Sequence, residues 1–223
     1  MQYEVEIKSL LGDEEQANLL RGKLENLDAN FALLSTNKQL NHYFTGGDLS
    51  RLAEAVAPHL SADANKKLQD LASKAKDFSV RTREKDGTVL LVAKVSVGSD
   101  SSSNGVARME FEEKADLSLE DLDQLLLNAG FEYQAKWSRE REEYLCKGVN
   151  VCLDHNAGYG WLAEFEKVVS DESKLDDARR EVKALMRECG VEELPQDRLE
   201  RMFQFYNAHW SDYYGTNKVF TIA

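Results

Sequence analysis

The chain has 223 residues, of which 42% are hydrophobic and 30% are charged. This composition excludes a disordered chain, and the length is sufficient for one domain over residues 1–223 with a large core and an internal site. The net charge of -12 opposes binding to nucleic acid or to an anionic membrane surface. Because no apolar run approaches the ~20 residues of a membrane-spanning helix, we expect a cytoplasmic protein.

The cysteines and histidines argue against a disulfide or zinc framework. The three cysteines form no Cys-x-x-Cys pair, and the four histidines show no His-x-x-x-His spacing. We therefore expect buried free thiols and no metal site built from histidine. Any metal in this protein is expected to bind oxygen ligands.

The first part of the chain predicts two strands, a helix between them and a helical insertion. Residues 3–8 alternate apolar and charged side chains with a period of two, as in a strand with one buried face. Asp13 can cap a helix whose apolar stripe extends to Leu27. A second strand is expected near residues 31–45. Residues 48–77 predict one or two helices, which we interpret as an insertion.

The rest of the chain predicts further antiparallel strands and helices. A hairpin is expected over residues 78–97, around the turn at Asp86-Gly87, followed by a strand at 107–112 and a helix at 118–129. The remaining elements are strands at 132–146, 149–155 and 161–169, a helix at 175–189 and a helix that opens at Pro195. The last two helices lie in a C-terminal extension over about residues 171–223.

Nearly every predicted strand places charged residues two positions apart, so that they project from one face. The charged positions are Glu4, Glu6, Lys8, Arg81, Arg83, Lys94, Arg108, Glu110, Glu112, Arg139, Arg141, Asp154, Glu164 and Glu166. Helices outside the sheet need apolar strand positions to pack against, and Val5, Ile7, Met109 and Phe111 can provide them. The charged face is then the interior of a closed barrel. We therefore expect an α+β fold in which about eight antiparallel strands form a tunnel, with helices packed outside.

Charges of both signs in a confined space indicate a charged ligand. Clustered carboxylates raise one another's pKa unless a cation is present, and clustered basic groups have the converse problem. A triphosphate with Mg²⁺ or Mn²⁺ satisfies both groups, because arginines bind phosphate oxygens and carboxylates bind hard cations. The alternative is an ion-pair network in a structural barrel, although buried ion pairs carry a desolvation cost.

The ordered charges resemble those of the CYTH domain family, the triphosphate tunnel metalloenzymes. Glu4-Val5-Glu6-Ile7-Lys8 matches the Glu-x-Glu-x-Lys signature that opens these proteins. The later pairs, from Arg81-x-Arg83 to Glu164-x-Glu166, are similar to the successive tunnel motifs of the family. The resemblance covers residues 1 to about 169. The family includes class IV adenylate cyclases, thiamine triphosphatases and inorganic triphosphatases.

The resemblance implies a role for each charged position. It places Glu4, Glu6, Lys8 and Arg108 in the catalytic group. The residues that bind the triphosphate would be Lys8, Arg81, Arg83, Lys94, Arg108, Arg139 and Arg141. The residues that bind metal or orient the nucleophile would be Glu4, Glu6, Glu110, Glu112, Asp154, Glu164 and Glu166. The cofactor would be Mg²⁺ or Mn²⁺, and the partner a small-molecule triphosphate: tripolyphosphate, ATP or thiamine triphosphate.

These residues leave more than one function open. In a triphosphatase, water attacks the terminal phosphorus of tripolyphosphate or of an organic triphosphate. In an adenylate cyclase, the ribose 3′ oxygen of ATP attacks the α phosphorus, and pyrophosphate leaves. We expect a metal-dependent triphosphatase, with the cyclase as the alternative and a non-catalytic triphosphate sensor as the third hypothesis.

Two segments depart from the family pattern. Residues 48–77 are long for the family, and the C-terminal extension is rich in aromatic residues, namely Phe203, Phe205, Tyr206, Trp210, Tyr213, Tyr214 and Phe220. These aromatics would pack against the outside of the barrel, form the contact of a homodimer or act as a lid. His155 would be exposed or would contact a base or leaving group.

Overall fold

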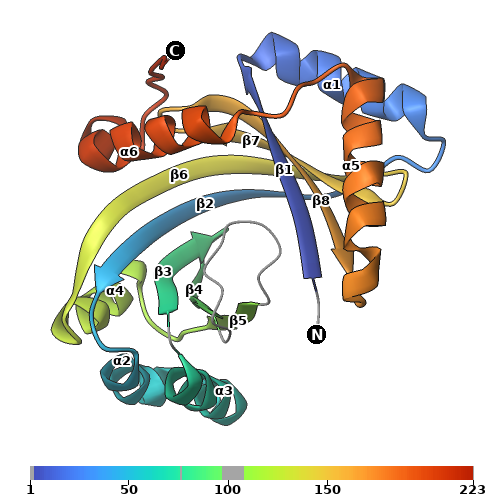
Figure 1. Cartoon of the computed structure of the whole chain (residues 1–223). Helices are drawn as coiled ribbons and strands as arrows, with labels where there is room; N and C mark the ends of the chain where they lie inside the picture. The colour runs from blue at the N-terminus through green and yellow to red at the C-terminus, as the bar shows by residue number, and fades with distance from the viewer. Residues whose placement is uncertain (1–2, 76, 97–107, 223) are drawn as a thin grey trace. The chain divides into compact units, whose positions relative to one another are not determined.

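The computed structural model describes residues 3–75, 77–96 and 108–222 (Figure 1). The strands are β1 (Tyr3–Gly12), β2 (Ala32–Gly46), β3 (Asp77–Lys85), β4 (Thr88–Ser96), β5 (Arg108–Lys114), β6 (Phe131–Cys146), β7 (Val149–Asn156) and β8 (Gly160–Val169). The helices are α1 (Glu14–Leu27), α2 (Leu49–Val56), α3 (Ala62–Lys74), α4 (Leu119–Asn128), α5 (Leu175–Cys189) and α6 (Gln196–Tyr213), with short 3₁₀ helices at Ala57–His59 and Glu172–Lys174. These bounds confirm the α+β class and the predicted order of elements. Of the helices in the described ranges, none combines the length and hydropathy that a membrane crossing requires.

The strands form one sheet in the order β1-β8-β7-β6-β2-β3-β4-β5. The pairs β1–β8, β8–β7, β7–β6, β2–β3, β3–β4 and β4–β5 are antiparallel, as expected. Within the described residues, hydrogen bonds do not join β5 to β1, so the closed barrel is not confirmed. A period-two pattern determines which side chains share a face, but it does not determine which edge strands meet.

The chain divides into two compact units, each with its own hydrophobic core. Unit 1 consists of residues 1–38 and 138–223, and unit 2 consists of residues 39–137. Strands β2 and β6 contribute residues to both units. The prediction that residues 1–223 form one domain stays a prediction.

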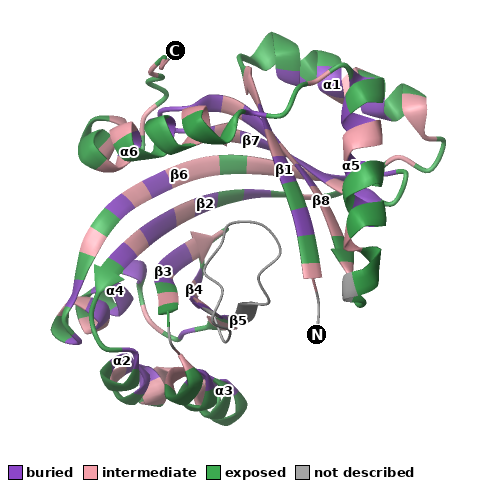
Figure 2. Cartoon of the chain, in the orientation of Figure 1, coloured by how far each residue is buried: buried purple, intermediate pink, exposed green. Residues whose placement is uncertain are grey.

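Unit 1 buries one face of its strands under α1 and α5. Val5 and Ile7 of β1 and Phe165 of β8 are buried together with Leu20 of α1 and Val182 of α5. Figure 2 shows the resulting alternation of buried and exposed positions along β1. The opposite face of the same strands is free to carry charge.

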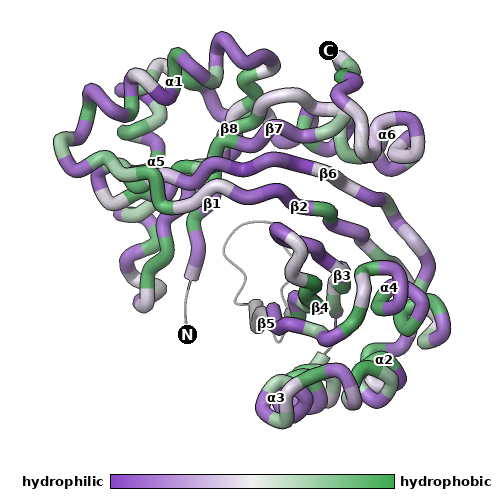
Figure 3. The backbone as a smooth tube through the Cα atoms, turned by 180° about the vertical axis from the view of Figure 1, so that it is seen from behind, coloured by the Kyte–Doolittle hydropathy of each residue, from purple (hydrophilic) through white to green (hydrophobic). Residues whose placement is uncertain are grey.

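Unit 2 has the same construction, with α2, α3 and α4 packed on one face of its strands. Val80, Leu91 and Phe111 of the strands are buried together with Leu68 of α3 and Leu122 of α4. Figure 3 shows hydrophobic and hydrophilic residues interleaved along these helices. The segment that the sequence marks as an insertion therefore supplies part of the core of this unit. Of the apolar strand positions predicted to face helices, only the side chain at position 109 lies outside the described part of the chain.

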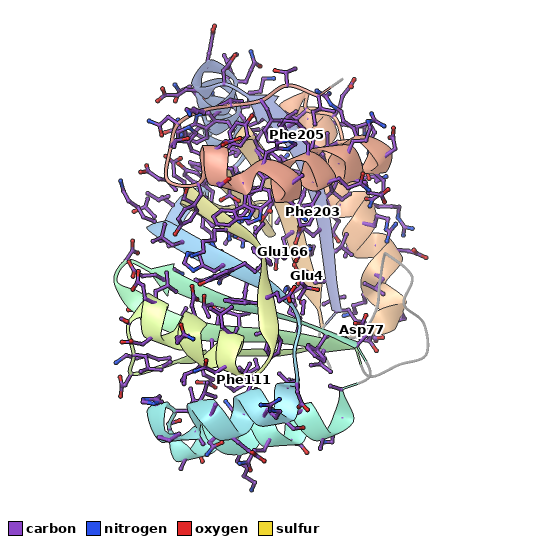
Figure 4. The ribbon with its side chains drawn as sticks, turned by 90° about the vertical axis from the view of Figure 1, so that its left-hand side faces the viewer. Glu4, Asp77, Phe111, Glu166, Phe203 and Phe205 are labelled. Carbon is purple, nitrogen blue, oxygen red and sulfur yellow. The ribbon has the colours of Figure 1, made fainter. Side chains whose placement is uncertain are left out.

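Aromatic residues of the C-terminal extension pack within unit 1. Tyr206 of α6 is fully buried and makes an edge contact with Tyr159, with ring centroids 5.8 Å apart. Phe220 packs on the same ring at 5.3 Å, and its backbone N–H donates to the carbonyl of Gly158. A side chain at position 158 would collide with the Tyr206 ring, so glycine is required there. Phe203 (Figure 4) is 40% exposed, and packing therefore accounts for only part of the aromatic set.

A buried carboxylate ties α4 to the sheet in unit 2. Asp123 is 2% exposed; it accepts hydrogen bonds from Thr82 Oγ1 at 2.5 Å and from the Tyr133 hydroxyl at 2.7 Å. The Nδ1 atom of His42 lies 2.6 Å from the same carboxylate. Burial opposes ionisation of Asp123, but the hydrogen bonds from His42, Thr82 and Tyr133 outweigh it and lower its pKa.

We predict that Asp123→Ala lowers the free energy of unfolding by about 3 kcal/mol, because the buried His42 and Thr82 and the half-buried Tyr133 lose their common partner. Urea denaturation of the purified chain measures this change. Gln124→Ala, an exposed position on the same helix, is the control and should change stability by less than about 0.5 kcal/mol. Equal stability of the two variants would show that the network does not hold α4.

Candidate functional site

The sheet register gathers the predicted charges of unit 1 on one face. It places Glu6 opposite Glu166, Lys8 opposite Glu164, and Arg141 opposite Asp154. Residues directly opposite in antiparallel strands point to the same side of the sheet. Their neighbours along the strands, such as Val5 and Ile7, point to α1 and α5. The charged face is therefore the one away from these helices.

Asp154 is 1% exposed and lies between two arginines. Arg141 donates from Nε to Oδ1 and from Nη2 to Oδ2, both at 2.6 Å, and Arg139 donates from Nη1 to Oδ2 at 3.0 Å. Burial opposes the charge on Arg141, but Asp154 and Glu164 outweigh it and hold the pKa of Arg141 well above its usual value. Both oxygens of Asp154 are thus occupied. This geometry suits orientation of the two guanidinium groups better than direct binding of a metal.

Lys8 bridges two carboxylates on the same face. Its Nζ atom lies 3.1 Å from Glu164 Oε1 and also forms an ion pair with Glu6. Glu164 forms a further ion pair with Arg141. Burial opposes ionisation of Glu164, but Lys8, Arg141 and Arg139 outweigh it and lower its pKa to about 2. Glu164 is therefore ionised, and cations of the chain itself neutralise it.

Glu166 is in the opposite electrostatic situation. Burial, together with the charges of Glu4 and Glu164, raises the pKa of Glu166 to about 7. Figure 4 shows Glu4 and Glu166 close together, on β1 and β8 respectively. A bound cation would relieve this repulsion, because it neutralises both carboxylates. The oxygen-rich corner at Glu4 and Glu166 is thus the part of the face whose chemistry fits a divalent cation.

The described residues do not contain a ready-made cluster of metal ligands. Among them, no three histidine, cysteine or acidic side chains are arranged to hold an ion. In unit 1, the ion pairs explain this result, because Glu6, Glu164 and Asp154 are turned toward basic side chains. A cation at this face would have to draw at least one carboxylate away from such a pair.

The raised pKa of Glu166 predicts a pH dependence of stability in the metal-free protein. The folded-state pKa of about 7 lies above the ordinary value of 4.5, so the folded state binds more protons than the unfolded state between these values. The stabilising contribution is complete below pH 4.5 and is lost as the pH rises through about 7. Glu166→Gln should remove this decline in the free energy of unfolding, as measured by urea denaturation across that range.

The control for this experiment is Glu140→Gln, which removes an exposed carboxylate from β6. The free energy of unfolding of Glu140→Gln should decline with rising pH as in the wild type, since both proteins retain Glu166. A decline of equal size in Glu166→Gln would show that another group causes it.

Unit 2 carries a second set of basic residues on one face. Arg83 donates from Nε to Asn41 Oδ1 at 2.8 Å and from Nη1 to Glu112 Oε1 at 2.9 Å. Arg81 donates to the Tyr43 hydroxyl at 2.7 Å and lies over the Tyr43 ring. The sheet register places Arg81 and Glu112 in one row across β3, β4 and β5. Glu112 therefore orients Arg83 much as Asp154 orients Arg141.

The remaining predicted residues of unit 2 are on β4 and β5. Lys94 lies opposite Glu110, and Ser96 lies opposite Arg108. By register, these positions belong to the same face as Arg81. The side chains of Arg108 and Glu110 lie outside the described part of the chain, so their roles stay predictions.

Sequence reasoning misses the uncharged residues on these faces. Asn41 and Tyr43 hold the two arginines of unit 2, and Asn150 lies beside Glu166 in unit 1. It also misses Glu143, although this residue continues the period-two series of Arg139 and Arg141 along β6. A search for charged residues does not detect neutral side chains such as these amides. The period-two alternation of each strand could have identified them, because it places their positions on the charged face.

His155 lies on the other face of the sheet from Asp154. Its ring stacks on Trp161, with ring centroids 5.1 Å apart, and successive residues of a strand point to opposite sides. The structure therefore gives no support to a contact between His155 and a base or leaving group at the charged face.

A comparison with known families identifies this arrangement. The CYTH domain family profile matches residues 2–198, which is most of the chain. The chain belongs to the CYTH domain family. A comparison with curated proteins finds no match.

Several solved structures share the fold of this CYTH chain. PH1819 from Pyrococcus horikoshii OT3 is 23% identical, with a TM-score of 0.60 over 91% of this chain and 99% of that one. A proposed adenylate cyclase from Vibrio parahaemolyticus is 16% identical, with a TM-score of 0.57 over 90% and 98%. HpAC1 from Hippeastrum, a proposed adenylyl cyclase with a dominant triphosphatase activity, is 16% identical, with a TM-score of 0.51 over 92% and 96%. At these identities, the likeness concerns the fold alone.

Proposed function

We propose that this CYTH protein is a divalent-metal-dependent triphosphatase that hydrolyses the terminal phosphate of tripolyphosphate or of an organic triphosphate. The observation that carries the proposal is the charged face of unit 1. There, arginines oriented by a buried carboxylate lie on the same face as carboxylates that crowd one another. Phosphate oxygens suit the arginines, and a hard cation suits the crowded carboxylates.

The basic residues of unit 1 bind and orient the substrate in this proposal. Arg139 and Arg141 donate to phosphate oxygens, while Asp154 limits their rotation. Lys8 neutralises charge beside them and is held by Glu164. Phosphoryl transfer depends mainly on such positioning and charge neutralisation, so the protein needs no covalent nucleophile.

The metal ligands that the structure supports best are Glu4, Glu6 and Glu166. Glu166 and Glu4 share excess negative charge, and Glu6 lies directly opposite Glu166. When bound, Mg²⁺ or Mn²⁺ supplies charge neutralisation and Lewis acidity toward the phosphate. Asp154 and Glu112 would serve instead to orient arginines, since each is hydrogen-bonded to a guanidinium group.

The basic residues of unit 2 have the same proposed role. Arg81 and Arg83 present guanidinium groups that Tyr43 and Asn41 hold in place, and they would bind phosphate oxygens. We extend this role to the basic residues of β4 and β5 that the family resemblance implies, Lys94 and Arg108. The closed barrel with its tunnel belongs to the same proposal.

The reaction that follows binding distinguishes hydrolysis from cyclisation. HpAC1 is described as having a dominant triphosphatase activity. Phosphate is therefore the first product to measure for the present protein. Purified protein with Mg²⁺ or Mn²⁺ is offered tripolyphosphate, ATP and thiamine triphosphate. Phosphate without cyclic AMP supports the triphosphatase, whereas cyclic AMP with pyrophosphate would replace it by the cyclase. Tight triphosphate binding without either product would indicate a sensor.

We predict that Glu4→Gln lowers kcat for phosphate release at least about a hundredfold, because the carboxylate that neutralises the cation is lost. The fold should be unaffected, since Glu4 is exposed on the strand and contributes little to the core. Steady-state kinetics with circular dichroism as a check on folding measure both effects.

The control is Glu140→Gln. Glu140 forms an exposed ion pair with Lys38, and its side chain points away from the face of β6 that carries Arg139 and Arg141. Its kcat should stay within about twofold of wild type, as for a surface ion pair of little energetic weight. Wild-type turnover in Glu4→Gln would refute the assignment of the metal corner.

A further inference from the structure

A neutral residue continues the row of carboxylates in unit 1. The register places Glu6 of β1 opposite Glu166 of β8, and Glu166 opposite Asn150 of β7. The three residues therefore lie side by side on one face of three adjacent strands. The charge pattern of the sequence does not extend to position 150, and none of the proposed roles includes it.

The contacts of Asn150 determine the orientation of its side-chain amide. Its Nδ2 atom donates to Glu143 Oε1 at 2.9 Å, and Glu143 Oε2 accepts from Ser35 Oγ at 3.0 Å. Because an ionised carboxylate can only accept hydrogen bonds, the amide nitrogen must be the atom that meets Glu143. The amide orientation is therefore set by hydrogen-bond chemistry, and the carbonyl oxygen is the atom left over.

That oxygen, Asn150 Oδ1, is buried, and no described residue donates a hydrogen bond to it. A buried carbonyl oxygen without a partner loses its hydration with no compensation. The residues directly opposite Asn150 on the two neighbouring strands are Glu166 and Leu145, and the ionised form of Glu166 has no hydrogen to donate. Coordination of a cation by Asn150 Oδ1 would provide the missing interaction.

We propose that Asn150 Oδ1 is a further ligand of the divalent cation, beside Glu166. The inference rests on the proposed function, because it places the cation at the same corner. Hard cations take amide carbonyl oxygens as ligands alongside carboxylates. A neutral ligand also completes the oxygen set without adding negative charge to a crowded group. Glu143 and Ser35 act as positioning residues, since they hold the amide in the ligating orientation.

The test measures binding of Mn²⁺ alone to the full-length chain, with no triphosphate present. Isothermal titration is performed at about pH 8, because metal binding competes less with protons at higher pH. Asn150→Leu keeps the approximate size of the side chain but removes its oxygen. We expect its Kd for Mn²⁺ to rise at least about tenfold. Asn150→Asp, which restores an oxygen ligand, should recover most of that loss.

Two comparisons separate a ligand from a merely structural amide. Asn156→Leu removes another buried amide from the same strand and face, and it should leave the Kd for Mn²⁺ unchanged. Binding of tripolyphosphate without metal should be equal in wild type and Asn150→Leu. If Asn150→Leu does not fold, as judged by circular dichroism, Asn150→Ala replaces it with the same expected rise in Kd.

The outcomes distinguish this inference from the proposed function. Wild-type Mn²⁺ affinity in Asn150→Leu, or in Asn150→Ala, together with lost affinity in Glu166→Gln, would overturn the role of Asn150 and leave the metal corner intact. A wild-type chain that does not bind Mn²⁺ would overturn the proposed function, and the inference with it. An equal loss of affinity in Asn156→Leu would also overturn the inference, because a general weakening of β7 would then explain the effect.

Discussion

The strict alternation of side chains along registered antiparallel strands is the constraint on which the rest of the molecule depends. In unit 1, one face buries Val5, Ile7 and Phe165 under α1 and α5, so the other face is available for charge. Unit 2 repeats this division with its own helices. A shift of one residue in any pairing would exchange the two faces and bury the charges. The apolar core therefore also determines where the site lies.

The carboxylates on the charged face of unit 1 are neutralised to different degrees by basic side chains. Asp154 and Glu164 are surrounded by Lys8, Arg139 and Arg141, whereas Glu166 is half-buried beside other carboxylates. One end of the face thus presents fixed cations, and the other presents unrelieved negative charge. A polyanion and a divalent cation are complementary to these two ends. The repulsion between the carboxylates near Glu166 would decrease when a cation binds.

The element order and the charged face could be predicted from the sequence, because period-two alternation and helix capping are local signals. The helix N-cap Asp13, for example, is present as the sequence indicates. Barrel closure could not be predicted in this way, since edge pairing depends on the chain as a whole. The different roles of the individual carboxylates could not be predicted from the sequence either. Asp154 and Glu166 look alike in the sequence, and only their neighbours in space separate an arginine-orienting group from a candidate metal ligand.

The most direct test of the account is the position of the cation itself. A crystal of the protein soaked with Mn²⁺ and tripolyphosphate would locate the ion by its anomalous scattering. We predict a peak within coordination distance of Glu166, on the face away from α1 and α5, with phosphate oxygens near Arg139 and Arg141. A peak elsewhere on the chain, or ordered tripolyphosphate with no ion at Glu166, would contradict it.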